Sequence, residues 1–444
     1  MSDTQISQTE HGMWGSFVRD YGMVFVLLVL VVLFSILTIS EKHPAGAEGG
    51  RQIAEQILER GREGAGVLIL TRDTGEDRRL SDAIEEALAG SGLVVRATVH
   101  GAPADARRAV AEILARGESI DFIAANDAVS GWGIFDKAEG LEREKLVTPP
   151  SYRWPTFLTW SNLSGVANQT AIYAIIAVGM TMVIITAGID LSVGSLVALA
   201  SVTGALLIRD FGSGKEAGME FMLGGLFLGV LACGLAGAFN GAMVTAFRVP
   251  AFIATLAMML MASGLAYRLS QGASIPELPP SFFWLGSDKT LGLPNPVWLM
   301  IGLYAVAHIV MTRTTFGRYV YAIGGNEEAA RLSGVPVRSI QLAVYTISGA
   351  LAGLGGIVLA SQLHAGDPKF GLTYELEVIA AVVVGGTSLY GGSGKILGTL
   401  IGAFIIAVIK NGMNLINIDP FSQDIVLGAV LLAAVLIDNL KRRV

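Results

Sequence analysis

Asp190 is the ionisable residue that is hardest to reconcile with its apolar surroundings. It lies in Thr186–Ser195, TAGIDLSVGS, between two long apolar runs. A carboxylate that faces lipid is costly, so Asp190 must reach water, a partner group or a helix start. We expect Asp190 or Ser192 to cap the helix that follows. Gly188 and Gly194 would then allow the chain to re-enter tightly.

Cysteine, metal and redox chemistry are not indicated. Cys233 is the only cysteine, which excludes a disulfide framework and a cysteine metal site. The histidines never occur at ligand spacing; they are His11, His43, His100, His308 and His364. We therefore expect no catalytic residue, no cofactor and no metal.

A second glycine-rich stretch imitates a phosphate-binding loop. Gly391–Lys395 reads GGSGK, like the end of a Walker A motif. That motif needs a glycine five positions before Gly394, where Leu389 stands, and a Ser or Thr after the lysine, where Ile396 stands. No Walker pattern occurs elsewhere in the sequence. If ATP drives this protein, another subunit must supply the ATPase.

The segment Thr312–Ile340 is a charged island between two apolar blocks. It carries four arginines and the acid pair Glu327 and Glu328. The arginines follow the positive-inside bias, which predicts a cytoplasmic loop. Within it we expect a short helix over Glu327–Leu332, because Asn326 can cap the first turn and the glutamates complement the helix dipole.

The neighbours of this short helix support the same interpretation. Ala329 and Ala330 favour propagation, while Gly325 and Gly334 bound the helix on its two sides. Arg331 lies four residues after Glu327 and can pair with it or with a carboxylate of a partner. A plain solvated loop is the alternative.

The composition places most of the chain in a bilayer. Of 444 residues, 52% are hydrophobic and only 15% are charged, and the mean hydropathy is +0.58. The stretch from Glu41 to Arg153 holds 35 of the 68 charged residues, which indicates one soluble insert. The net charge of −6 and the scattered basic residues give no reason to propose nucleic acid as a partner.

Ten apolar segments predict an all-α polytopic membrane protein with about ten transmembrane helices. They are Tyr21–Ser40, Asn168–Ala187, Leu191–Ile208, Phe221–Asn240, Ala251–Leu269, Val297–Met311, Leu342–Ala360, Leu376–Leu389, Ile396–Met413 and Ile425–Leu440. An even number puts both termini on one side, and Lys441–Arg443 make that side the cytoplasm. A signal peptide cleaved near Ala47 is the alternative for the first segment, but its apolar run exceeds the usual length.

The insert, residues 41–153, is expected to be a small α/β domain outside the membrane. Three strands are predicted at Gly66–Thr71, Val94–His100 and Asp121–Asn126, with helices at Leu80–Ala89 and Asp105–Arg116 between them. This alternation is typical of parallel βαβ units. Asp127 follows the third strand, where open parallel sheets bind ligands, but a structural or docking role for the insert is favoured.

Several motifs resemble the permeases of ATP-binding-cassette importers for monosaccharides, of the ribose and xylose type. TAGIDLSVGS is similar to their GGIDLSVGS, with Ala187 in place of the first glycine, and GGNEEAARLSGV matches their cytoplasmic docking helix. The resemblance runs from about Asn168 to the C-terminus. The signature residues are Gly188, Asp190, Ser192, Gly194, Asn240, Pro250, Phe252, Thr255, Gly385, Gly386 and Thr387.

The resemblance implies a bacterial inner-membrane permease subunit, residues 154–444 plus a first helix within 1–40, that forms half of a translocation pathway. Its partners would be an ATPase subunit, a periplasmic sugar-binding protein, a second permease subunit and membrane lipid. The ATPase would dock on Gly325, Asn326, Glu327, Glu328, Ala329, Ala330, Arg331, Leu332 and Gly334. The insert is similar to part of one lobe of a periplasmic sugar-binding protein, and we expect it to lack a complete site.

An ion-gradient-driven secondary transporter of a small polar solute is the alternative function. It would need buried carboxylates or broken helices in two matching halves, whereas Asp190 and Lys410 have no evident counterparts. Glu375 and Glu377 are expected at the outer, solvated end of the segment Leu376–Leu389, with a position on a pathway as the alternative.

Overall fold

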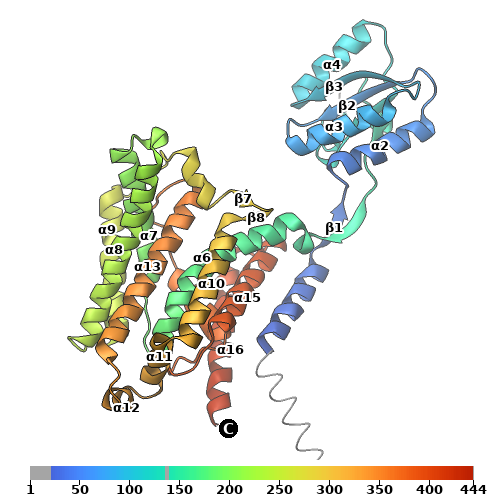
Figure 1. Cartoon of the computed structure of the whole chain (residues 1–444). Helices are drawn as coiled ribbons and strands as arrows, with labels where there is room; N and C mark the ends of the chain where they lie inside the picture. The colour runs from blue at the N-terminus through green and yellow to red at the C-terminus, as the bar shows by residue number, and fades with distance from the viewer. Residues whose placement is uncertain (1–21, 136–139, 444) are drawn as a thin grey trace, which may run out of the picture. The chain divides into compact units, whose positions relative to one another are not determined.

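The computed structural model describes residues 22–135 and 140–443, and the chain divides into two compact units (Figure 1). Ile39–Pro155 form one unit, and the residues up to Thr38 together with those from Thr156 onward form the other. The tail before residue 22 and the side chains of Lys441–Arg443, which carry the expected cytoplasmic charge, lie outside the described part.

The smaller unit has a four-stranded parallel sheet with strand order β3-β2-β4-β5. Its strands are β2 (Gly66–Thr71), β3 (Val94–His100), β4 (Phe122–Ala125) and β5 (Leu146–Val147), and its helices are α2 (Gly46–Arg60), α3 (Gly75–Leu88), α4 (Pro103–Ala115) and the short α5 (Asp127–Ser130). The three predicted strands and two predicted helices are confirmed.

All six residues of strand β2 are buried, which agrees with its place between β3 and β4 inside the sheet. Leu68 and Leu70 pack into the cluster that holds α4, whereas Val67 and Ile69 pack with α2 and α3. Helices therefore cover both faces of the sheet, as expected for a parallel sheet.

The two ends of the smaller unit are joined to each other. Strand β1 (Ile39–Lys42) pairs antiparallel with β6 (Tyr152–Pro155), from Ile39 opposite Pro155 to Lys42 opposite Tyr152. The chain thus enters and leaves this unit at adjacent positions.

The larger unit is helical. Its helices are Gly22–Leu37, α6 (Trp160–Ile185), α7 (Val193–Leu206), α8 (Met219–Thr245), α9 (Ala251–Ser270), α10 (Asn295–Arg313), α11 (Thr315–Gly325), α12 (Glu327–Leu332), α13 (Val337–Leu363), α14 (Tyr374–Val384), α15 (Ile396–Leu415) and α16 (Pro420–Arg443). The short strands β7 (Lys289–Thr290) and β8 (Leu293–Pro294) form a hairpin.

Among the described residues, seven helices are long and apolar enough to cross a membrane. They are α6, α7 with its π-helical extension to Phe211, α8, α9, α10, α13 and α15. Gly22–Leu37 and Pro420–Leu436 are shorter apolar helices, and α14 has eleven residues. The protein is therefore a multi-pass helical membrane protein, and within the described residues each of the ten predicted apolar segments is wholly or largely helical. Because only seven of the described helices are both long and apolar enough to span, the count of about ten spans stays a prediction.

Helix α6 is the centre of the bundle, and α13 packs against α8, α6 and α7 (Figure 1). Small residues make the crossing of α8 and α13 close: a Cβ added at Gly349 would collide with the Cys233 carbonyl, and one added at Gly237 would collide with the Tyr345 carbonyl. In a bilayer such contacts replace the hydrophobic effect as the force that holds helices together.

Candidate functional site

Helix α12 forms over Glu327–Leu332, as predicted, and its first turn is capped as predicted. The Asn326 side-chain oxygen accepts the amide of Ala329 at 2.9 Å. Glu327 and Glu328 occupy the first turn, where negative charge complements the helix dipole. Six residues would rarely hold a helix alone, so these caps specify it.

The C-terminal end of α12 is closed by a Schellman motif. The Gly334 amide donates to the Arg331 carbonyl and the Val335 amide donates to the Ala330 carbonyl, each at 3.0 Å. Gly334 has φ = +86°, a conformation that glycine adopts without the steric cost of a Cβ. The predicted role of Gly334 in turning the chain away is confirmed.

The expected ion pair of α12 differs from the sequence prediction. Arg331 binds both carboxylate oxygens of Glu328, at 2.6 and 2.7 Å, rather than pairing with Glu327. The bidentate contact at the three-residue spacing takes the place of the predicted pair at the four-residue spacing. The hydrogen bond to Glu328 raises the pKa of Arg331. Glu327 is left available to an external partner.

One side of α12 is anchored and the other is open. Ala330 is buried with Ile323 and Val337, and Val335 packs on this small cluster. Leu332, by contrast, is 80% exposed. Leu332, together with Glu327 and with Arg331 held by Glu328, forms a compact exposed surface that can fit a groove on another protein.

The segment before α12 lies against the loop that imitates a phosphate-binding sequence. A Cβ added at Gly324 would collide with the Ile185 carbonyl, and the Gly392 amide donates to that same carbonyl at 2.8 Å. The Tyr321 hydroxyl donates to the Gly394 carbonyl at 2.9 Å. The glycines of this loop therefore form a close backbone junction between the end of α6 and the end of α11, the helix directly before α12.

Asp190 is completely buried and bound by hydroxyl and amide donors. One carboxylate oxygen accepts the Ser192 amide at 3.0 Å and the Ser192 hydroxyl at 2.6 Å. The other accepts the Ser348 hydroxyl from α13 at 2.9 Å. Ser192 is the N-cap residue of α7, but its side chain makes no capping bond. Of the two predicted capping residues, Ser192 does not cap α7, because its hydroxyl is bound to Asp190, whereas Asp190 accepts the Ser192 amide directly before the helix.

Two further helices join this network. Asn240 of α8 donates to the Ser192 hydroxyl at 3.1 Å, and Thr255 of α9 donates to the Ile189 carbonyl at 3.2 Å. The segment after α6 is thereby tied to α8, α9 and α13. A Cβ added at Gly188 would collide with the Tyr345 hydroxyl, and one added at Gly194 would collide with the Glu375 carboxylate.

The remaining signature residues lie outside the Asp190 network. Pro250 is the residue before α9, Phe252 is exposed on α9, and Gly385 ends α14. Gly386 has φ = +81°, and the buried Thr387 lies against Gly394 in the same turn. These residues shape helix ends rather than one site.

Glu377 does not lie at a solvated helix end. Its carboxylate accepts a hydrogen bond from the Lys410 ammonium of α15 at 2.8 Å, and its side chain is only 11% exposed. The expectation of a solvated terminus is wrong because α14 starts only after the chain has turned back between α6 and α15. Tyr173 and Tyr374, which pack beside this pair, carried no recognisable signal in the sequence.

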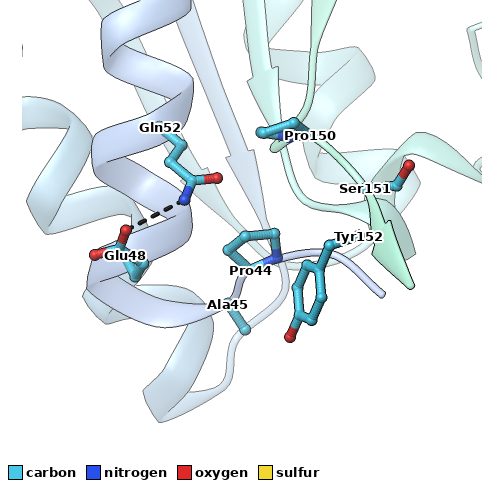
Figure 2. A pocket seen from close by; sticks show the side chains of 7 residues that line it. All are labelled: Pro44, Ala45, Glu48, Gln52, Pro150, Ser151 and Tyr152. Carbon is cyan, nitrogen blue, oxygen red and sulfur yellow. Dashed lines mark hydrogen bonds between the residues drawn. The ribbon is translucent and has the colours of Figure 1, made fainter. Parts of the chain in front are cut away.

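The smaller unit has an open hollow of about 570 Å³, which Figure 2 shows. It is lined by Pro44, Ala45, Glu48, Gln52, Pro150, Ser151 and Tyr152, beside the segments that enter and leave the unit. Asp127 lies 3.4 Å from the ring of His43 and so has a partner within the unit. Among the described residues, no group of acids, histidines and cysteines could hold a metal.

Comparison with known proteins identifies the class. A profile of the family described as branched-chain amino acid transport system / permease component matches residues 162–435. The ribose import permease protein RbsC of Escherichia coli (strain K12) is 43% identical over 325 residues, which cover 71% of this chain and 98% of that protein. The L-arabinose transport system permease protein AraH of the same strain is 41% identical over 289 residues, 65% of this chain and 86% of that protein.

A relative from another organism is similar over the same region. The ribose import permease protein RbsC of Bacillus subtilis (strain 168) is 42% identical over 289 residues, 65% of this chain and 87% of that protein. No solved structure matches the chain. The apolar helices and the matched region define a transport permease. The chain belongs to the branched-chain amino acid transport system permease component family, and the resemblance to ribose-type permeases is confirmed.

Proposed function

We propose that this protein is the transmembrane permease subunit of an ATP-binding-cassette importer that carries a monosaccharide of the ribose or arabinose kind. The observation that carries the proposal is the sequence identity of more than 40% to a ribose and an arabinose permease, over 98% and 86% of their lengths. The protein is the conduit, and it does not itself catalyse a reaction. The Gly391–Lys395 loop supports a separate ATPase subunit, because its glycines serve in packing against Ile185 and Gly324.

The driving subunit is an ATPase that docks on α12. The exposed Leu332, the free Glu327 and the fixed Arg331 form its contact surface. The glycine junction supports the transmission of motion, because the end of α11, directly before α12, packs closely on the end of α6, where the Gly392 amide also bonds the Ile185 carbonyl.

The pathway forms between two permease subunits, either two copies of this chain or one copy with a homologue. Ten spans, with both termini and α12 in the cytoplasm, give the arrangement consistent with the basic residues Arg313, Arg318, Arg331 and Arg338. The unit Ile39–Pro155 is then periplasmic, where it can contact the sugar-binding protein that delivers the solute.

An ion-driven transporter is less well supported. Such a carrier would need a titratable or ion-binding group with access to both sides, whereas Asp190 is fully buried and bound by three donors.

Uptake of radiolabelled D-ribose and L-arabinose tests the proposal. Cells that lack their own pentose permeases, and that express this chain with its cognate ATPase and binding protein, should accumulate one of the sugars in an ATP-dependent manner. Reporter fusions after Gly334 and in the loop Gly90–Ser91 should read as cytoplasmic and periplasmic respectively. Uptake that persists without the ATPase subunit would contradict the proposal.

A further inference from the structure

A cluster of charged and aromatic side chains lies where α14 begins. The Lys410 ammonium donates to Glu377 at 2.8 Å and lies 5.7 Å from the centre of the Tyr173 ring. The rings of Tyr173 and Tyr374 have their centres 4.6 Å apart. Three helices, α6, α14 and α15, therefore bring together one ammonium, one carboxylate and two phenol rings.

This cluster lies near the middle depth of the bundle. Tyr173 is close to the midpoint of α6, so it lies about 18 Å from either end of that helix at 1.5 Å per residue. Helix α14 starts there, at Tyr374, after a non-helical segment that follows α13. A Cβ added at Gly194, at the start of α7, would collide with the Glu375 carboxylate, so the two segments lie close together. Broken helices that begin at the membrane midplane are where transporters place solute sites.

The cluster has unused hydrogen-bonding capacity. Within the described residues, the second carboxylate oxygen of Glu377 is buried and has no partner. The Lys410 ammonium can donate three hydrogen bonds, and one goes to Glu377. A buried acceptor without a partner is costly unless something else supplies a donor.

The cluster also opens toward one face of the chain. The Lys410 side chain is 21% exposed, and Leu376, next to Glu377 on α14, is 53% exposed. A lysine and a glutamate at this depth do not face hydrocarbon, because lipid cannot solvate their charges. This face must therefore meet water or another polar surface.

We propose that Tyr173, Tyr374, Glu377 and Lys410 form the contact site for a neutral, hydroxyl-rich solute in the translocation pathway. A hydroxyl can donate to the free oxygen of Glu377, another can accept from Lys410, and a tyrosine ring can cover the C–H face of the solute. The inference rests on the proposed importer function, and it adds the place and the chemistry of solute recognition.

Thiol labelling tests whether this face is wet. Cys233, the only native cysteine, is buried, so the chain offers a low background. In membranes containing the complete transporter, Leu376→Cys should react at least tenfold faster with a charged, membrane-impermeant methanethiosulfonate than Leu260→Cys does. Leu260 is 67% exposed near the middle of α9, so it is a control of comparable exposure that lies away from the charged cluster. Equal rates at the two positions would overturn the inference.

Transport measurements test the solute chemistry. Glu377→Gln and Tyr173→Leu should lower uptake of labelled ribose or arabinose at least tenfold, with ATPase activity stimulated by the binding protein kept within twofold. Tyr173→Phe, which keeps the ring, should retain uptake. The exchanged pair Glu377→Lys with Lys410→Glu should insert normally but stay inactive; if the exchange restored full uptake, the pair would be structural and the inference wrong.

The two proposals can fail separately. Slow labelling at residue 376 in a transporter that imports pentoses would refute the solute site and leave the importer function intact. Import of leucine in place of either sugar by the unaltered chain would refute the sugar importer and the neutral polyol site together, even if residue 376 were labelled rapidly.

Discussion

At the scale of single residues, the Asp190 network is a structural lock whose donors are all neutral. A buried carboxylate without a cation depends on its hydrogen bonds, because each missing donor leaves charge in a medium of low dielectric. Among the described residues, Ser348 donates the one hydrogen bond that runs from α13 to Asp190. The lock therefore ties the segment after α6 to the most extensively packed helix of the bundle.

Removal of one donor should weaken the fold measurably. Ser348→Ala should lower the free energy of unfolding by about 2 kcal/mol, because a buried hydrogen bond to a charged group is lost. The thermal midpoint of the purified protein in detergent measures this effect. Thr346→Ala is the matched control, since the Thr346 hydroxyl bonds only to the Leu342 carbonyl of its own helix. Equal midpoints for the two variants would show that Ser348 does not support Asp190.

Ala187 occupies a backbone position that favours glycine. Helix α6 ends in a Schellman motif in which the Ala187 amide donates to the Ile184 carbonyl and the Gly188 amide donates to the Val183 carbonyl. Ala187 has φ = +62°, in the left-handed region that is costly for residues with a Cβ. The departure from the resembling motif at Ala187, noted in the sequence, therefore imposes backbone strain.

The substitution Ala187→Gly should therefore stabilise the protein by about 1 kcal/mol. Ala350→Gly, within α13, should have the opposite sign and a similar size, because glycine is unfavourable inside a helix. Both are measured by thermal unfolding of the purified protein in the same detergent. A fall in the midpoint for Ala187→Gly would contradict the strain argument.

At the scale of elements, α12 should act through its surface and not through its stability. Its ion pair is exposed, so Arg331→Ala should leave the thermal midpoint of the purified protein nearly unchanged. We expect Glu327→Ala, Arg331→Ala and Gly334→Pro each to lower both sugar uptake and recovery of the ATPase subunit in pull-down assays, with normal amounts of protein in the membrane.

Arg108→Ala is a matched control for Arg331→Ala. Arg108 pairs with Asp105 at the same three-residue spacing on α4 of the smaller unit, and this pair is also exposed. It should leave uptake and pull-down unchanged. Undiminished recovery of the ATPase by a Glu327→Ala, Arg331→Ala double variant would end the docking hypothesis.

Elements with strong local signals were predictable, and elements set by tertiary contacts were not. Strand β2 and helix α12 have the predicted bounds because buried β-branched runs and explicit caps act locally. Helix α2 was not predicted because it begins with glycines, which disfavour helices. Glycine is required there by packing, since a Cβ added at Gly49 would collide with the Pro44 carbonyl. The Asp190 partners on α8 and α13, like the Lys410 and Glu377 pair, are set by helix packing that periodicity does not encode.

At the scale of the whole molecule, the two units should be separable. Because Ile39 pairs with Pro155, removal of residues 43–151 and closure of β1 onto β6 with a two-residue turn should leave the membrane unit folded. Size-exclusion chromatography and thermal unfolding in detergent report the outcome. A second deletion that also removes β1 and β6 is the control for the strand pair itself. Aggregation of the first variant would show that the membrane unit depends on the insert.

The position of the inserted unit, between the first helix and Phe157, also constrains the order of assembly during synthesis. The first helix packs through Phe34 on Phe157, and the Thr38 hydroxyl accepts the Phe157 amide, yet Phe157 follows the whole inserted unit in the chain. At ordinary translation rates the ribosome needs about 6–23 s to cover that distance. The nascent first helix must wait in the bilayer for this time without its docking partners. Ribosome stalling within the insert would thus leave the first helix in the bilayer without its contacts to Phe157.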